Sequence, residues 1–201
     1  MVRCVLLMVS LAFAIAGCAT VPPHSLALSD FRQYRIANVT VEGVDVIRSW
    51  PNEEDAFVKA NVVNSDTLHR IQARPAAEYP PLKAHLQRVL NERFQLEFAS
   101  QVAPVFTGGR PVRAVIRLRQ FDVPSVARRV FVDNDAKIQA DIDLVDAGTG
   151  TPLLRYSGPH RTRRLIGGLA TGFAVALDRS DVGMSLITDY MTAYRNWLLR
   201  N

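Results

Sequence analysis

The stretch Lys137–Leu144, KIQADIDL, has the clearest pattern in the chain. Isoleucine, alanine, isoleucine and leucine occupy every second position, and polar residues fill the positions between them. This period of two is typical of a β-strand that buries one face and exposes the other. A glycine-rich turn over Asp146–Gly150 follows, and Thr151–Tyr156 again suits a strand. The sequence therefore predicts a β-hairpin.

Two further strands are predicted before this hairpin. Over Val112–Leu118 every second residue is apolar, and the residues between them are mainly arginine. After Gln120 the apolar role passes to Phe121 and Val123, a change of phase that a β-bulge produces. The stretch Arg35–Val44 is rich in β-branched residues and predicts the first strand.

Two helices are also predicted. Pro80-Pro81 suits a first helical turn, and apolar residues then recur at helical spacing, which predicts a helix over Pro81–Phe98. A second helix is predicted over Leu186–Leu198, with Asp181 as a candidate N-cap. The stretch 45–77 lacks such a period and is interpreted as a long connection with a short strand or helical turn. The order of elements predicts an α+β two-layer sandwich, a mostly antiparallel sheet with two helices on one face.

The N-terminus carries a targeting signal. One charge, Arg3, precedes the apolar run Val5–Ala16, which is shorter than the roughly 20 residues that a membrane-spanning helix needs. The run ends in Ile15-Ala16-Gly17-Cys18, an aliphatic residue, two small residues and a cysteine. This motif resembles the lipobox of bacterial lipoproteins. The resemblance implies that the thiol of Cys18 is the nucleophile that accepts a lipid, and that the small side chains before it give a peptidase access to the bond between Gly17 and Cys18.

The resemblance implies a signal peptide over 1–17, a lipidated tether over 18–30 and a single α+β domain over 31–201. An ordinary signal peptide that ends near an incidental cysteine is the alternative. In lipoprotein sorting an aspartate after the lipidated cysteine implies retention at the inner membrane. Ala19 stands there instead, which implies the periplasmic side of the outer membrane, with the inner membrane as the alternative. In layout the domain is similar to auxiliary lipoproteins of lipid-transport systems and to the lipopolysaccharide-assembly lipoprotein.

Composition limits the remaining possibilities. Of 201 residues, 48% are hydrophobic and 21% are charged, as in a folded protein. The formal charge of +5 falls to 5 − 1 = +4 when Arg3 is removed, which is too little for a nucleic-acid-binding protein. Of the two cysteines, Cys4 leaves with the signal peptide and Cys18 is alkylated, so no disulfide or cysteine metal site is expected.

No familiar catalytic or metal motif is present. The histidines lack zinc-site spacing, Asp133–Asp135 lacks the later glycine and glutamate of a calcium loop, and no serine stands in a Gly-x-Ser-x-Gly elbow. The sequence therefore predicts no enzyme, metal or cofactor. A binding or accessory subunit with an envelope partner is expected, and the alternatives are a small-ligand or lipid-binding domain and an envelope hydrolase of unrecognised type.

Two basic stretches are candidate binding sites. Arg113, Arg117 and Arg119 lie on one strand and could bind phosphate or carboxylate bidentately; the alternative is pairing with Asp141 and Asp143 across the hairpin.

The second stretch is Leu165–Leu177, which is apolar and glycine-rich and contains Gly168 and Gly172 at small-xxx-small spacing. Three arginines precede it: Arg161, Arg163 and Arg164. The stretch is expected to contact the membrane interface or a partner, and a buried connector is the alternative.

Overall fold

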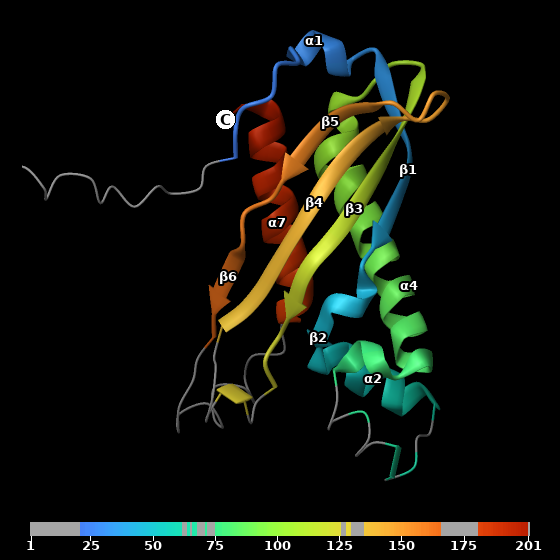
Figure 1. The fold of residues 1–201 in the computed structure, drawn as a ribbon, viewed down its shortest axis with the longest axis vertical. Coiled ribbons are helices and arrows are strands. Elements are labelled where there is room, and N and C mark those ends of the chain that lie inside the picture. Colours follow the sequence, from blue (N-terminus) through green and yellow to red (C-terminus); the bar gives the residue numbers. More distant parts are fainter. Residues whose placement is uncertain are drawn as a thin grey trace, which may run out of the picture.

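The structure, a computed structural model, describes residues 21–61, 64, 66–67, 71, 75–125, 128–129, 135–165 and 181–200. Its described strands form one mixed sheet, and helices α4 (Pro80–Glu97) and α7 (Val182–Leu199) both pack on the same face of that sheet (Figure 1). The predicted α+β two-layer sandwich is therefore confirmed. Among the described residues, no helix combines the length and the apolar character needed to span a bilayer.

The sheet is built around two long central strands, β3 (Arg110–Asp122) and β4 (Asp135–Asp146), which pair antiparallel. On the outer side of β3, β1 (Tyr34–Glu42) and β2 (Ile47–Ser49) run parallel to it. On the outer side of β4, β5 (Pro152–Ser157) and β6 (Arg161–Arg164) run antiparallel to it. Three of these five pairings are antiparallel, in keeping with the predicted sheet.

The predicted bulge in β3 is present. Leu118 pairs with Ala140 and Gln120 pairs with Gln139, so Arg119 is the extra residue. Its insertion moves the buried face from Leu118 to Phe121, as the change of phase in the sequence predicts. The hairpin between β4 and β5 is confirmed as well, with its turn closed by a hydrogen bond from the Gly150 amide to the Asp146 carbonyl (2.9 Å).

Both predicted helices are confirmed. Leu82, Leu86, Leu90 and Phe94 of α4 are fully buried against the sheet, as the apolar stripe predicts. The helix then continues into a π-turn, η3 (Phe98–Val102), and a short 3₁₀ turn, η4 (Ala103–Val105).

The prediction for the stretch 45–77 is wrong in one respect, because it contains an eleven-residue helix, α2 (Pro51–Asn61). The helix has clear start signals. Pro51 occupies its first turn, Glu53 and Glu54 follow in that turn, and the Glu54 carboxylate accepts a hydrogen bond from the Trp50 amide (2.6 Å). Only Phe57 of α2 is buried, so no apolar stripe reveals the helix.

The rest of that stretch, where described, includes the predicted short strand, which is β2 (Ile47–Ser49), and two short 3₁₀ turns. The turns are η1 (Val44–Val46), at the end of β1, and η2 (Ala76–Glu78), just before α4.

The segment before β1 differs from the extended tether expected over 18–30. Residues 21–27 run beside the last turns of α7, and α1 (Leu28–Phe31) follows (Figure 1). The Trp197 indole donates to the Pro22 carbonyl (2.8 Å), and the Arg200 guanidinium donates to the His24 (2.9 Å) and Leu26 (2.6 Å) carbonyls. The described part of the expected tether is therefore docked on the domain.

Candidate functional site

The face of the sheet opposite α4 and α7 is open among the described elements, and Figure 1 views the molecule from this side. Charged side chains of neighbouring strands stand on it in alternating sign. We call this set the charge ladder: Glu42 of β1, Arg117 and Arg119 of β3, Asp141 and Asp143 of β4, and Arg155 of β5. The pleat puts these residues on the outer face because the apolar residues between them fill the core.

Asp143 is the centre of the charge ladder. Its side chain is only 4% exposed because guanidinium groups cover it from both sides. Arg117 Nη1 donates to Oδ2 (2.5 Å), and Arg155 donates to Oδ1 and Oδ2 (2.9 and 3.1 Å). Burial would raise the pKa of the Asp143 carboxyl, but the hydrogen bonds and charges of Arg155 and Arg117 outweigh it and hold the pKa below its ordinary value.

The outer members of the charge ladder are more exposed. Arg119 donates twice to Asp141 Oδ2 (2.8 and 2.6 Å), and Arg117 also donates to Glu42 (3.1 Å). In the register of β3 and β4, Asp141 lies opposite Arg117 and Asp143 lies opposite Val115. Arg119 and Arg117 therefore reach Asp141 and Asp143 diagonally across the strand pair.

The three arginines of the predicted anion site do not converge on one point. Arg117 and Arg119 pair with Asp143 and Asp141, which is the alternative that the sequence left open. Arg113 lies opposite Val145, is exposed, and has no ion pair within the described part of the chain. Anion binding by this set stays a prediction, with Arg113 as its unpaired member.

The turn at the end of the hairpin is held by a second acidic residue, Asp146. Its carboxylate accepts hydrogen bonds from the Thr149 amide (2.8 Å), the Gly148 amide (3.0 Å) and Arg110 Nε (2.7 Å). The Thr149 amide is the main reason that the pKa of Asp146 lies below its ordinary value. This network closes the turn and ties it to the start of β3.

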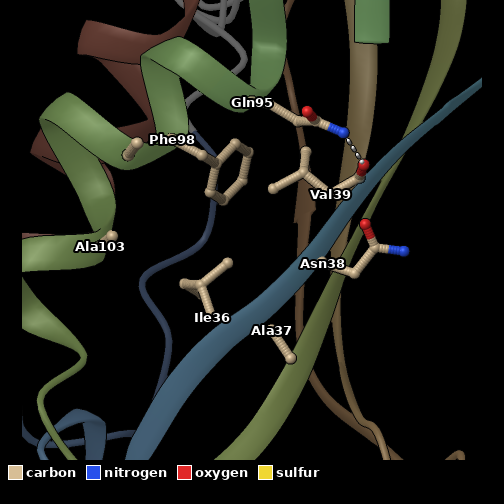
Figure 2. Close-up of a pocket in the computed structure, with 8 residues that line it drawn as sticks. Ile36, Ala37, Asn38, Val39, Gln95, Phe98 and Ala103 are labelled. Carbon is tan, nitrogen blue, oxygen red and sulfur yellow. Dashed lines mark hydrogen bonds between the residues drawn. The ribbon is translucent and has the colours of Figure 1, made fainter. Parts of the chain in front are cut away.

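A small groove lies along the free edge of β1, beside the end of α4 (Figure 2). Its volume is about 290 Å³; six of its eight lining residues are apolar, but polar atoms make up more of the exposed lining than apolar atoms do. Ile36 and Phe98 approach each other across it, while Asn38 points to the other side of the strand (Figure 2). The lining residues are Ile36, Ala37, Asn38, Val39, Gln95, Phe98, Ala99 and Ala103.

Next to the groove, α4 satisfies the free edge of β1. Gln87 donates to the Val41 carbonyl (2.8 Å), Asn91 accepts from the Val41 amide (3.1 Å), and Gln95 donates to the Val39 carbonyl (3.4 Å). The apolar period that predicts this helix does not identify this role of its polar residues. The repeat of amide side chains at positions i, i+4 and i+8 is the signal that could have found it.

The second predicted site is only partly described. Its three arginines lie on β6 and are exposed; Arg163 lies 3.5 Å from Asp189, and Arg164 lies 3.8 Å from Asp135. Gly168 and Gly172 are outside the described residues, as are Gly17 and Cys18 of the N-terminal motif. In the described ranges, no group of three or more histidine, cysteine or acidic side chains is placed to hold a metal ion.

Comparisons with known proteins give little. No protein-family model and no curated protein matches the chain. One distant structural neighbour is a candidate lipoprotein from Caulobacter crescentus CB15, with a TM-score of 0.29 and 17% sequence identity over 57% of this chain and 80% of that one. A TM-score this low supports no inference about the present chain.

Proposed function

We propose that the protein is a bacterial lipoprotein, anchored by lipid on Cys18, that faces the periplasm from the outer membrane. The observation that carries the proposal is the Ile15–Cys18 motif directly after a short apolar run. Each buried methylene of an acyl chain stabilises membrane binding by about 0.8 kcal/mol, so two or three chains would hold the protein permanently.

Metabolic labelling tests the anchor. Cells that express the wild-type protein or Cys18→Ser are grown with labelled palmitate, and both proteins are immunoprecipitated. We expect label on the wild type alone, with Cys18→Ser retained at the size of the uncleaved precursor. Equal labelling of the two proteins would contradict the anchor. Density separation of the membranes then reports the compartment, and Ala19→Asp should move the protein to the inner-membrane fraction.

We further propose that the domain acts by binding, as an accessory subunit of an envelope transport or assembly system. The charge ladder supports this role because it is an open set of ion pairs on one face of the sheet. Its central carboxylate, Asp143, has a lowered pKa and is bonded to two arginines, so it is poorly suited to donating a proton. Arg113 adds an exposed cation to the same face, and its side chain has no ion pair with the residues that the structure describes.

Photo-crosslinking in cells tests the binding role. A photoreactive amino acid replaces Arg113 on the open face, and a control replaces Glu92, which is exposed on α4 on the other side of the sheet. We expect a discrete crosslinked protein from position 113 and none from position 92. A monomer without crosslinks at both positions would overturn the proposal.

A second candidate function is the binding of a small ligand or a lipid, and the groove beside β1 favours it. Its volume of about 290 Å³ is near the lower end of ligand pockets, about 300 Å³. Native mass spectrometry of the detergent-extracted protein should then show a bound mass. Ala103→Phe, which fills the groove, should remove that mass, and a wild-type protein free of ligand would exclude this function.

A further inference from the structure

The segment that follows Cys18 in the sequence is docked on the domain and exposes a leucine and arginines. We define the anchored end as residues 21–35 together with Arg200, which follows the last turn of α7. The Pro22, His24 and Leu26 carbonyls all accept hydrogen bonds from α7 or from Arg200, so the segment is fixed to the domain. Figure 1 shows α1 at one tip of the molecule, with η1 and α2 near the other.

Covalent geometry limits how far this end can stand from a lipid on Cys18. Cys18 precedes Val21 by three residues, and consecutive Cα atoms are about 3.8 Å apart, so the two Cα atoms lie within about 11 Å of each other in any conformation. An extended tether of about ten residues would reach roughly 30 Å, but most of it is docked on α7. A lipid on Cys18 would therefore hold the anchored end close to the bilayer.

The exposed side chains at this end suit a bilayer surface. Leu28 is 52% exposed, although most large apolar residues are buried. The Arg32 side chain is exposed and has no partner among the described residues, and the Arg35 side chain uses only Nε, which donates to the Gly109 carbonyl (3.3 Å). The acidic residue here, Asp30, is bonded to the Ala27 amide (2.7 Å). The end therefore presents net positive charge around an exposed leucine.

We infer that the anchored end docks on an anionic bilayer, with Leu28 at the interface and Arg32 and Arg35 against lipid phosphates. The inference rests on the proposed lipid anchor at Cys18, since the anchor brings this end to the membrane. Basic side chains are attracted to an anionic leaflet, and an exposed leucine gains from its transfer out of water. Docking fixes the orientation, so that the far end with η1 and α2 points into the periplasm.

Spin labelling tests the orientation in the full lipidated protein. A nitroxide is attached at Leu28→Cys or, as the control, at Val46→Cys. Val46 is also an exposed apolar residue (37%), but it lies in η1 beyond the nine residues of β1, about 30 Å of strand. The protein is reconstituted into vesicles of phosphatidylethanolamine and phosphatidylglycerol. We expect the ratio of oxygen to water-soluble nickel accessibility to rise severalfold at position 28 and to stay unchanged at position 46.

The charge component is tested in the same assay. Vesicles of phosphatidylcholine alone, or the Arg32→Gln/Arg35→Gln variant in anionic vesicles, should lose most of the rise at position 28. The inference is overturned if the label at 28 stays as accessible to nickel as the label at 46, or if neutral vesicles protect it equally. Protection that depends on protein concentration in detergent would also overturn it, because a second copy would then cover the end.

The absence of a lipid on Cys18 would be recognised separately from the absence of docking. If Cys18 is alkylated and Cys4 is removed, the wild-type protein has no thiol left and takes up no nitroxide. Uptake by the wild type, together with absence of palmitate, would overturn the proposed anchor. A palmitoylated wild type that takes up no label, with position 28 still exposed to water, would overturn the docking alone.

Discussion

Gly183, in the first turn of α7, shows how one residue fixes the packing at the far end of the molecule. A Cβ atom built on it would lie 2.3 Å from the indole Nε1 of Trp50. That indole is fully buried and donates to Asp181, the N-cap of α7 (3.0 Å). The ring cannot move aside because it also packs on Phe121 at 4.8 Å between centroids.

The first prediction follows from this contact. Gly183→Ala should lower the free energy of unfolding by about 1–3 kcal/mol, the usual cost of an overpacked core. Gly109→Ala is the matched control, because a Cβ there meets nothing within 4 Å and should change stability little. Urea denaturation of the two purified variants measures the difference, and equal midpoints would contradict the packing described.

Asp143 leads to a prediction about how the stability of the protein depends on pH. Its pKa is lowered in the folded state from an ordinary 3.8, so its ion pairs contribute stability above that value, and the contribution is lost as the pH falls through the folded pKa. Asp143→Asn should destabilise the protein by about 1–3 kcal/mol at neutral pH. It should also remove part of the acid sensitivity below about pH 4. Denaturation midpoints of both proteins between neutral and acid pH test this, and parallel curves would contradict it.

At the scale of elements, α4 both packs on the core and protects the edge of β1. One face buries the apolar stripe, and Gln87 and Asn91 bond the Val41 backbone at the open edge of β1. An unprotected strand edge is a template for pairing with another chain. The amide row therefore satisfies the edge and also protects it from a second molecule.

The corresponding prediction concerns self-association. Gln87→Leu/Asn91→Leu frees the edge, and about 1 kcal/mol of stability should be lost for each missing hydrogen bond. Light scattering after size exclusion should then show dimers or larger species. Glu92→Leu adds an apolar residue to the exposed side of α4 without freeing the edge, and it should remain like the wild type. If both variants associate equally, added hydrophobicity is the cause and the edge is not.

Elements with one strong period could be predicted from the sequence. The strict alternation in β4 and the change of phase at Gln120 predict the hairpin and the bulge, because a pleated strand transmits burial directly to every second residue. α2 could not be recognised by period, since it buries only Phe57. For the candidate site, the sequence left two alternatives open, anion binding by the arginines or pairing with the aspartates of the hairpin. The register between β3 and β4 decides whether Arg117 pairs with Asp143, and the sequence does not show that register.

At the scale of the whole molecule, the first described residues contact the last turns of α7. The Trp197 indole donates to the Pro22 carbonyl across 175 residues of sequence, and His24 Nε2 lies 2.8 Å from the Leu198 carbonyl. No periodicity in 18–30 signals this contact, because it depends on backbone carbonyls that every residue has. For this reason the sequence predicts a tether over 18–30, although the described part of that segment is docked on α7.

The last prediction tests whether this contact sets the distance between the domain and its anchor. Trp197→Phe keeps an aromatic ring beside Tyr156 but removes the donor to Pro22. We expect faster amide hydrogen exchange and new protease cleavage within 21–27, with global stability reduced by only about 1 kcal/mol, since one hydrogen bond is lost. Trp50→Phe also removes one indole donor, but in the core against Asp181, so it should lower global stability and leave 21–27 protected. If both variants release the segment equally, it is held by general stability and not by α7, and the short reach from Cys18 to the domain would no longer follow.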